Sequence, residues 1–441
     1  MNERSGLLKS WRVSRTPAPP SPAPLTVPGD KSISHRAVML AALAEGESEI
    51  VNFLPGHDCV ATAKALEALG VPISWLAPDR LLVRGGTAFK PPRGALDCGN
   101  SGTSMRLLAG LLAGQGVAAE LHGDASLSRR PMRRIIDPLA RMGARIVALG
   151  EEGRPPLRIE DSSGIKGISY KVPVASAQVK SSILLAGLGA RGETCVSEPV
   201  PTRDHTERML PSFGVSIERS NDRACLTGRQ PLRATRIDVP GDFSSATFLL
   251  LAGLIGPREI RVDSVGVNSA RTGFLRLMDV MGGTLQIAAR RTSGSEPVAD
   301  VMASPCMLQG ALLPASFVPS AIDEMPAVFA AAACAMGETL IEGAEELRVK
   351  ESDRIAAMVS GLKSLGVVCE ETPDGARIRG GRVRGGEIDC KGDHRVAMAF
   401  AVLALAAQDP IVVRDVDCVD TSFPGFAETA LQLGLNLESI D

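Results

Sequence analysis

The sequence predicts an α/β fold built from one repeated unit, and three observations support this. Six times along the 441 residues, a small polar cluster precedes an almost entirely apolar stretch of helix length. A short β-like run and an amphipathic helix follow each time, and the repeats are about 70 residues apart. The amphipathic helix then ends at a glycine, before residues rich in Val and Ile. We expect helix, strand, helix and strand in each unit, and two sets of three units.

The polar clusters are predicted helix N-termini. Their anchor residues are Lys31 (cluster 30 to 36), Gly102 (99 to 106), Ala177 (176 to 182), Ser244 (241 to 246), Asp323 (321 to 326) and His394 (393 to 398). A helix N-terminus presents unpaired backbone N–H groups and partial positive charge, so several of them can together bind an anion. The clusters therefore predict a strongly anionic small substrate.

The later elements of each unit follow from the glycines and the apolar runs. The glycines that end the amphipathic helices are Gly70, Gly143, Gly214, Gly282, Gly366 and Gly434. The apolar runs at 107 to 114, 248 to 256 and 328 to 337 are too short and too interrupted to span a bilayer. They predict helices buried on all sides, and we expect no membrane partner.

Composition excludes several classes of protein. The net charge is −2, with only two Trp and one Tyr, which disfavours nucleic-acid binding. Nine cysteines without CxxC spacing predict reduced thiols in a cytoplasmic protein. The five histidines show no ligand spacing, so we expect neither a metal nor a cofactor.

Cations near the predicted helix starts are candidates for phosphate binding. Lys31, Ser32 and Arg36 could hold a phosphate with an ammonium, a hydroxyl and a guanidinium. The alternative is a solvated helix cap with a surface ion pair. Around Gly102, the glycine-rich loop could bring its backbone close to a ligand, with Asn100 and Thr103 as hydrogen-bond donors.

The fifth and sixth units hold the acid–base candidates. Asp323 precedes an unbroken apolar helix, where a carboxylate is costly unless it meets a cation or a substrate hydroxyl. The segment RVKESDR is expected to bring Lys350, Glu351 and Arg354 within one helical turn. The alternative is an ordinary salt-bridged surface turn. Arg395 adds a further cation at the sixth helix start.

Taken in order, these motifs resemble the 5-enolpyruvylshikimate-3-phosphate synthase family, a transferase family of the shikimate pathway. The resemblance runs from Leu25 to the C-terminus and is carried by PGDKSISHR, GNSGT with Arg106, SAQVKS, TRDHTE, IDEMP, RVKESDR and DHRVAM. It implies two pseudo-threefold domains of βαβαββ-type units, an inside-out α/β barrel called the enolpyruvyl transferase fold. Residues 25–29 with 241–441 would form domain one (repeats 4 to 6), and 30–240 would form domain two (repeats 1 to 3). We expect the active site in the cleft between the domains, and a flexible leader at residues 1–24.

The resemblance also implies a reaction and its residues. The enolpyruvyl group of phosphoenolpyruvate would pass to the 5-hydroxyl of shikimate 3-phosphate, with release of phosphate and without a covalent enzyme adduct. By analogy the shikimate 3-phosphate ligands are Lys31, Ser32, Arg36, Ser176, Ala177, Gln178, Arg203, Asp323 and Lys350. The phosphoenolpyruvate ligands are Lys31, Gly102, Arg130, Gln178, Arg354 and Arg395. Asp323 and Glu351 would transfer protons and Lys31 would assist phosphate departure.

Some positions resemble the second sequence class of this family. Thr421 stands where many members have a lysine, and Ala177 where they have a serine. Gly102 would leave room for the inhibitor glyphosate, so we expect a glyphosate-sensitive monomer. One rival is an enolpyruvyl transferase that acts on a UDP-amino sugar, which would carry a reactive cysteine where this chain has LHGDASLSRRPM. A binding protein without catalysis is the other rival, disfavoured by the intact Lys31, Asp323 and Glu351.

Overall fold

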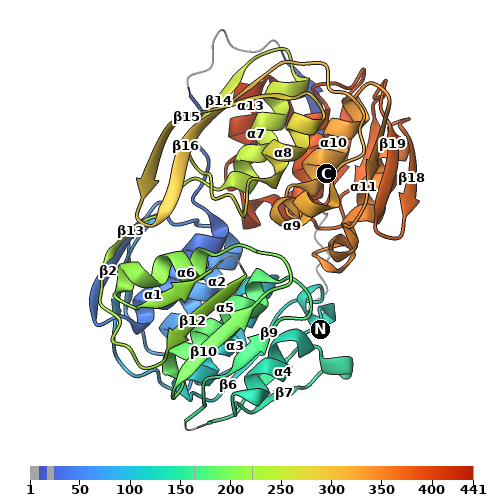
Figure 1. Cartoon of the computed structure of the whole chain (residues 1–441). Coiled ribbons are helices and arrows are strands. Elements are labelled where there is room, and N and C mark those ends of the chain that lie inside the picture. Colours follow the sequence, from blue (N-terminus) through green and yellow to red (C-terminus); the bar gives the residue numbers. More distant parts are fainter. Residues whose placement is uncertain (1–8, 17–23, 163, 221, 441) are drawn as a thin grey trace. The chain divides into compact units, whose positions relative to one another are not determined.

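The chain divides into two compact units, and each is assembled from more than one segment of the chain. The computed structural model describes residues 9–16, 24–162, 164–220 and 222–440. Unit 1 takes the described residues up to Pro28 together with Gly241–Arg291 and the residues from Pro297 onward, and unit 2 takes Gly29–Pro240 and Thr292–Glu296. Figure 1 colours the chain from blue to red.

Residues 292–296 differ from the sequence-based assignment, which placed them in domain one. The reason is the pairing of a buried acid with a buried histidine. Glu296 Oε1 lies 2.8 Å from Nδ1 of His205, and both side chains are buried. The tip of the β15–β16 hairpin therefore groups with unit 2.

Unit 2 is built around three buried helices, α1 (Lys31–Leu43), α3 (Gly102–Gln115) and α5 (Ala177–Gly189). They pack against one another, with α3 in contact with both α1 and α5. A second set of helices accompanies them: α2 (His57–Ala68), α4 (Arg133–Arg141) and α6 (His205–Met209), which runs on into the 3₁₀ turn η3 (Leu210–Phe213).

Three sheets complete unit 2. The first has the order β13-β2-β4-β3, from β13 (Arg236–Asp238), β2 (Gly46–Val51), β4 (Arg80–Gly85) and β3 (Ile73–Ala77). The second is β5-β6-β8-β7, from β5 (Leu96–Asp97), β6 (Ala119–His122), β8 (Leu157–Ile159) and β7 (Ile146–Ala148). The third is β11-β12-β10-β9, from β11 (Ile217–Arg219), β12 (Arg223–Thr227), β10 (Glu193–Ser197) and β9 (Ser169–Lys171).

Unit 1 repeats the plan. Its buried helices are α7 (Phe243–Ile255), α10 (Met325–Cys334) and α12 (His394–Leu403), which contact one another pairwise. The others are α8 (Gly273–Val280), α9 (Val318–Ala321), α11 (Arg354–Ser364) and α13 (Phe426–Leu433). In Figure 1, β15 and β16 lie on one side of α7 and α8, and β18 and β19 lie beyond α10 and α11 on the other.

Two sheets of unit 1 have three strands and the third has four. The first has the order β14-β16-β15, from β14 (Ile260–Gly266), β16 (Glu296–Ser304) and β15 (Thr284–Ser293). The second is β17-β19-β18, from β17 (Glu338–Ile341), β19 (Gly375–Arg379) and β18 (Val368–Thr372). The third is β20-β21-β1-β22, from β20 (Gly386–Asp389), β21 (Ile411–Arg414), β1 (Ser10–Arg15) and β22 (Leu435–Ile440).

One pairing scheme recurs in the sheets. In unit 2 each sheet has one parallel pair (β13 with β2, β5 with β6, β9 with β10), and its remaining pairs are antiparallel. In unit 1 the sheet with β20 and β21 likewise has one parallel pair, and its other pairs are antiparallel. In the other two sheets of unit 1, single parallel bridges at Leu25 and Leu312 stand where the parallel pair would be. The predicted sixfold repetition is thus confirmed. Every described sheet is open at both edges.

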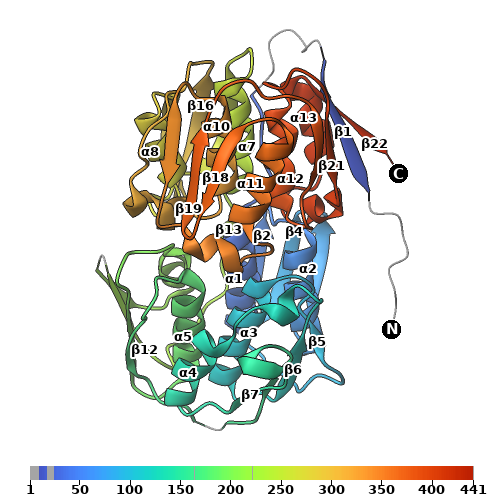
Figure 2. The same ribbon diagram turned by 90° about the vertical axis from the view of Figure 1, so that its right-hand side faces the viewer.

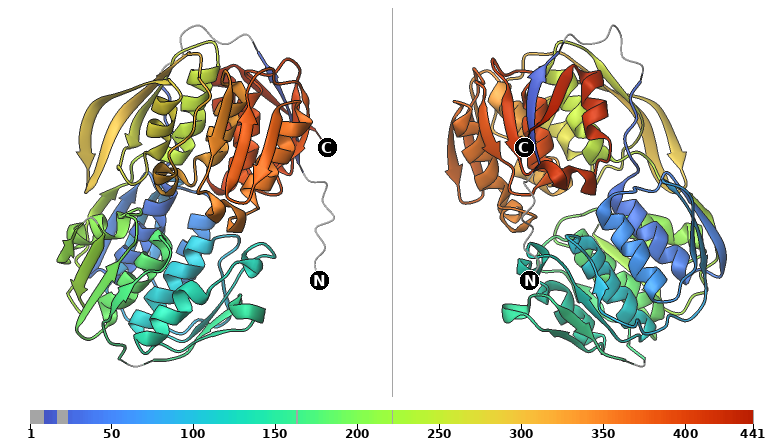
Figure 3. Two further views of the ribbon diagram at one scale, coloured as in Figure 1. Left: turned by 45° about the vertical axis from the view of Figure 1, so that its right-hand side comes forward. Right: turned by 180° about the vertical axis from the view of Figure 1, so that it is seen from behind.

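The prediction of a flexible leader is wrong for residues 10–15, because β1 is an inner strand of its sheet. It pairs antiparallel with β21 on one side and with β22 on the other, as Figure 2 shows and as the right-hand view of Figure 3 shows from behind. Val13 is fully buried, and the Trp11 ring stacks on Phe426 with centroids 5.9 Å apart. Residues 1–8 and 17–23 of the expected leader lie outside the described residues.

The buried helices begin where the polar clusters predict. Four of them start at the anchors Lys31, Gly102, Ala177 and His394, and the other two start one residue earlier or two residues later. Capping explains the positions: Asp30, Ser101, Ser176, Asp242 and Asp393 each accept a hydrogen bond from a backbone N–H of the first turn. α10 has no such side-chain cap and starts with Pro326 in its first turn.

The expectation that every cysteine is reduced is wrong for one pair. Cys195 and Cys225 lie directly opposite each other on β10 and β12, which brings their Cα atoms to 4.1 Å, and they form a disulfide. Across the described ranges, no helix combines the length and the apolar character that crossing a membrane requires.

Candidate active site

In unit 2 the first two turns of α1 carry the predicted ammonium of Lys31 and guanidinium of Arg36. Lys31 Nζ lies 2.5 Å from Oδ2 of Asp58 in α2, and its side chain is largely buried. Arg36 is almost fully buried: Nε donates to Thr206, Nη2 to Ser181 and Nη1 to the carbonyl of Ser32. The alternative of a solvated surface pair is therefore excluded for both cations.

Burial changes the acid–base properties of Arg36. Loss of solvation lowers the pKa of this guanidinium to about 10, against the opposing attraction of Glu207 and with additional repulsion from Arg203. Two guanidiniums thus repel one another in this part of the unit. An incoming dianion would relieve that repulsion, so the pair favours an anionic ligand.

The starts of α3 and α5 are joined by a chain of polar contacts. Arg106 Nη1 donates to Oε1 of Gln178 at 2.5 Å, and Gln178 Nε2 donates to Thr103 at 2.9 Å. Arg130 Nη2 donates to Asn100 at 2.7 Å. Sequence reasoning named Asn100 and Thr103 as donors to a ligand, whereas here Asn100 accepts from Arg130 through Oδ1 and Thr103 accepts from Gln178.

Gly102 lies against two of these guanidiniums. A Cβ at this position would be 2.9 Å from Nη1 of Arg106 and 3.0 Å from Nη1 of Arg130. The absence of a side chain therefore leaves the space beside both cations. Ser176, which caps α5, and the partly buried Ala177 and Arg203 are the remaining predicted ligands in unit 2.

A buried cluster of charged side chains connects α5 to Glu198 and Glu207. Lys180 Nζ lies 2.6 Å from Glu198 and 2.8 Å from Glu207, and all three side chains are almost fully buried. Burial by itself would lower the pKa of Lys180, but the two carboxylates outweigh it and raise this pKa above its ordinary value. Sequence reasoning missed this cluster because its members are far apart in the chain.

In unit 1 a second set of charges surrounds Arg354. Its side chain is almost fully buried, with Nη2 2.6 Å from Glu351, Nε 2.7 Å from Asp393 and Nη1 3.5 Å from Asp323. Burial would lower the pKa of this guanidinium, but the three carboxylates raise it above its ordinary value. Arg354 is therefore a permanent cation whose donors contact carboxylates.

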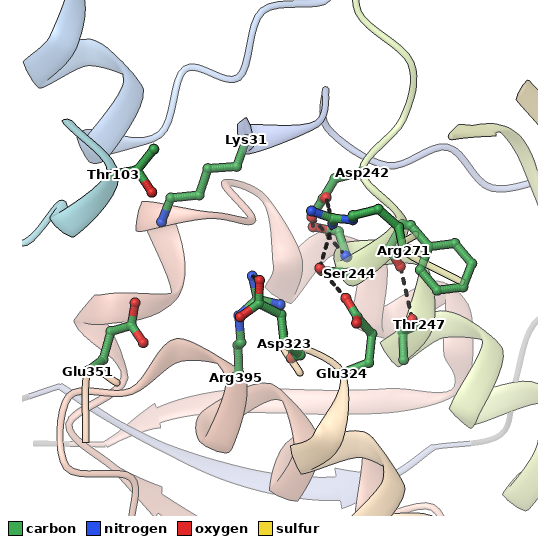
Figure 4. Close-up of polar contacts among 12 residues, drawn as sticks. Lys31, Thr103, Asp242, Ser244, Thr247, Arg271, Asp323, Glu324, Glu351 and Arg395 are labelled. Carbon is green, nitrogen blue, oxygen red and sulfur yellow. Dashed lines mark hydrogen bonds and ion pairs between the residues drawn. The ribbon is translucent and has the colours of Figure 1, made fainter. Parts of the chain in front are cut away.

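Asp323 is held between two guanidiniums. Besides Arg354, Nη2 of Arg395 lies 3.6 Å from the Asp323 carboxylate, and Nη1 of Arg395 donates to the Asp323 carbonyl at 3.1 Å. Figure 4 shows Asp323 next to Arg395, with Glu351 carried on a neighbouring segment. The structure thus brings together Asp323, Glu351, Arg354 and Arg395, which the family resemblance names as site residues.

Two details differ from the sequence-based expectation. Lys350 and Glu351 do not lie in a helical turn, because the 3₁₀ segment η5 (Glu345–Val349) ends before them and α11 begins at Arg354. Glu351 contacts Arg354 from the short segment between η5 and α11. Asp393, whose sequence position marks it only as a helix cap, also contacts Arg354 and so belongs to the cluster.

Comparisons with known proteins identify a family for this chain. Residues 20–430 match the family described as EPSP synthase (3-phosphoshikimate 1-carboxyvinyltransferase). A 3-phosphoshikimate 1-carboxyvinyltransferase from Methylococcus capsulatus is 54% identical over 417 residues, 94% of this chain and 95% of that protein. One from Xanthomonas campestris pv. campestris is 52% identical over 418 residues, 94% and 95% of the two chains.

Solved structures show the same fold. The EPSP synthase from Acinetobacter baumannii superposes with a TM-score of 0.86 at 45% identity, covering 98% of this chain and all of that one. The enolpyruvyl transferase NikO from Streptomyces tendae, at 18% identity, superposes with a TM-score of 0.78 over 98% and 99% of the two chains, which shows the shared fold alone. The repeated units, the charged helix starts and these matches together place the chain in the EPSP synthase family.

Proposed function

We propose that this chain transfers the enolpyruvyl group of phosphoenolpyruvate to the 5-hydroxyl of shikimate 3-phosphate and releases inorganic phosphate. Family membership over nearly the whole chain supports the reaction. The observation that carries it is the Arg354 cluster, in which two arginines and two candidate acid–base carboxylates meet. Cations for an anionic substrate and groups for proton transfer are thus present together.

Phosphoenolpyruvate binding would rearrange this cluster. Arg354 contacts three carboxylates, so a substrate carboxylate that binds it must compete with Glu351 or Asp323. Glu351 is the better candidate to leave, because it lies on the linker before α11 and is partly exposed. A new anion beside it would favour its protonated form, and a protonated Glu351 is what donation to the substrate requires.

The chemistry then needs one base, one acid and one leaving-group stabiliser. The 5-hydroxyl oxygen bonds to C2 of phosphoenolpyruvate as its proton passes to Asp323, while Glu351 protonates the C3 methylene. The tetrahedral adduct then loses phosphate from C2 and returns a proton from C3 to the Glu351 carboxylate, which restores the carbon–carbon double bond. Lys31 offsets the charge that develops on the departing phosphate.

The other predicted residues bind and orient the substrates. Ser32, Arg36, Ser176, Ala177, Gln178, Arg203 and Lys350 are proposed for shikimate 3-phosphate, and Gly102, Arg130, Arg354 and Arg395 for phosphoenolpyruvate. Since these residues belong to both units, we propose that the substrates bind between the units and that the units close on them. Small-angle scattering should then show a smaller radius of gyration with shikimate 3-phosphate, and an unchanged radius at saturation would contradict closure.

Further parts of the proposal follow from the family resemblance. Glyphosate would compete with phosphoenolpyruvate beside Gly102, and the enzyme would act as a monomer in the cytoplasm. Sedimentation of the purified chain tests the monomer.

A phosphate-release assay tests the function directly. Phosphate should appear only when enzyme, phosphoenolpyruvate and shikimate 3-phosphate are all present, and omitting any one gives the baseline. A UDP-amino sugar in place of shikimate 3-phosphate separates the rival transferase, and binding of both substrates without any phosphate release would indicate the binding protein instead.

A further inference from the structure

The fourth polar cluster has no part in the proposed function, although its residues are as deeply buried as those of the others. In GDFSSA, Asp242 and Ser244 are each about 2% exposed. Asp242 caps α7 through its Oδ2, which accepts from the backbone N–H and the hydroxyl of Ser245. Its other carboxylate oxygen and Ser244 face Arg271, which lies before α8.

These residues form a continuous hydrogen-bonded network that ends at α10. Arg271 Nη2 donates to Asp242 Oδ1 at 2.8 Å and to Ser244 Oγ at 2.7 Å. Ser244 in turn donates its hydroxyl proton to Oε1 of Glu324. Figure 4 shows the connected side chains, and Arg271 and Glu324 are 3% and 1% exposed. Water cannot replace these contacts at such burial, so the carboxylate of Glu324 is held in one place.

Glu324 directly follows the proposed base. Asp323 and Glu324 occupy the turn before Met325, the first residue of α10. Glu324 also closes this turn through its backbone, with N–H donating to the Ala321 carbonyl at 2.8 Å and its own carbonyl accepting from Ala327. The two side chains go to different partners: Asp323 to Arg354 and Arg395, and Glu324 to Ser244. Fixing one side chain of the pair restricts the other.

We propose that Glu324 is a positioning residue that, through Ser244 and Arg271, fixes where the Asp323 carboxylate lies. The inference rests on the proposed function, because it assigns Asp323 a proton transfer that depends on its position. A general base must lie within hydrogen-bond reach of its proton, and a displacement of about 1 Å can reduce the rate about 100-fold. α10 has no side-chain cap, and the Ser244 contact holds this turn together with the backbone hydrogen bonds of Glu324.

Three variants separate positioning from general destabilisation. Glu324→Ala removes the acceptor of Ser244, and we expect kcat to fall about 10- to 100-fold while the KM of each substrate stays within about threefold. Glu324→Gln keeps an acceptor oxygen for Ser244 and should recover most of kcat. Ser245→Ala is the matched control, since it removes a buried hydroxyl from the same turn of α7 that touches Asp242 and not Glu324. It should keep wild-type kcat.

A double-mutant cycle with Asp323→Asn tests the route of the effect. If Glu324 acts through Asp323, Glu324→Ala should reduce kcat by less than about threefold when Asp323 is already Asn. An equal reduction in both backgrounds would overturn the proposal, as would a Glu324→Ala enzyme with wild-type kcat. If Glu324→Ala does not fold, Ser244→Ala, which removes the hydroxyl that Glu324 accepts from, takes its place in the same cycle, and wild-type kcat in Ser244→Ala would overturn the proposal.

The two proposals fail in different ways. A wild-type chain without phosphate release would remove the proposed function and the positioning role with it. An active wild-type enzyme whose Glu324 and Ser244 variants change only the KM values would leave the function standing and remove the positioning role.

Discussion

Arg354 illustrates what a single buried cation requires. Three carboxylates surround it, and without them a guanidinium with 1% exposure would cost several kcal/mol. The same three carboxylates include the proposed base and acid, so the arginine proposed to bind substrate and the groups proposed to move protons share one electrostatic network. Under the proposed roles, substrate binding and proton transfer would be linked at this residue.

Replacing the proton-transfer residues tests their roles. Asp323→Asn or Glu351→Gln should lower kcat by about 10²- to 10⁴-fold, because each removes a positioned base or acid. The KM values should change only several-fold, as the amides still accept hydrogen bonds. Glu338→Gln, which alters an exposed pair with Arg377, is the control. Turnover near the wild-type level in either variant would exclude that residue from the mechanism.

Gly102 determines how much room is left beside two arginines. In Gly102→Ala the new methyl would press on the ends of the Arg106 and Arg130 side chains, which can shift at a cost of about 1–3 kcal/mol. A change of about 1.4 kcal/mol corresponds to a tenfold change in affinity. We therefore expect the affinity for glyphosate to fall tenfold or more, and the affinity for phosphoenolpyruvate, the shorter molecule, to fall less. The ratio of glyphosate inhibition constant to phosphoenolpyruvate KM measures this. An unchanged ratio would show that Gly102 does not line the inhibitor's pocket.

His35 makes stability depend on pH. Its ring is fully buried with Nδ1 2.8 Å from Thr62, and burial, followed by the charges of Lys31 and Arg36, lowers its pKa well below the ordinary 6.5. The unfolded chain therefore binds a proton near pH 6.5 that the folded chain does not, and stability is lost as pH falls from there toward the folded pKa. Urea unfolding between pH 7.5 and 5 should show this decrease, with a smaller decrease in His35→Gln. Equal slopes would mean that His35 is not the group responsible.

At the scale of elements, helix starts were predictable and one strand was not. Asp30, Ser101 and Ser176 are good N-caps directly before apolar runs, so local sequence defines α1, α3 and α5. The sequence of β1 gives little local indication of a strand, because its six residues, SWRVSR, mix polar, charged and apolar side chains. Its position depends on pairing with strands about 400 residues away.

Truncation shows whether β1 completes unit 1. Deleting residues 1–16 would leave β21 and β22 without their shared partner, and the loss of Val13 burial alone costs about 1.5–3 kcal/mol. We expect the free energy of unfolding to fall by at least that amount, with aggregation through the unpaired strands. Deleting only residues 1–8 keeps β1 and is the matched control. Equal stability of the two truncated chains would contradict the role of β1.

At the scale of the molecule, repetition made the fold predictable, while the contacts within the site needed the structure. The spacing of the clusters predicts six repeats, and the family resemblance names Lys31, Asp323, Glu351 and Arg354 as site residues. Spacing cannot reveal that Lys31 pairs with Asp58 or that Ser244 reaches Glu324, since these contacts join different elements. Residues that only support the site therefore emerge from tertiary structure.

The measurement that tests the proposed reaction most directly is the isotope content of the product formed in D₂O. Addition and elimination pass through a methyl group at C3, so deuterium from solvent should appear in the methylene of the product, with one phosphate released per product formed. Mass spectrometry of the enolpyruvyl product, with Glu351→Gln as the low-activity comparison, provides both values. Product formed without deuterium, or phosphate released without product, would contradict enolpyruvyl transfer by this route.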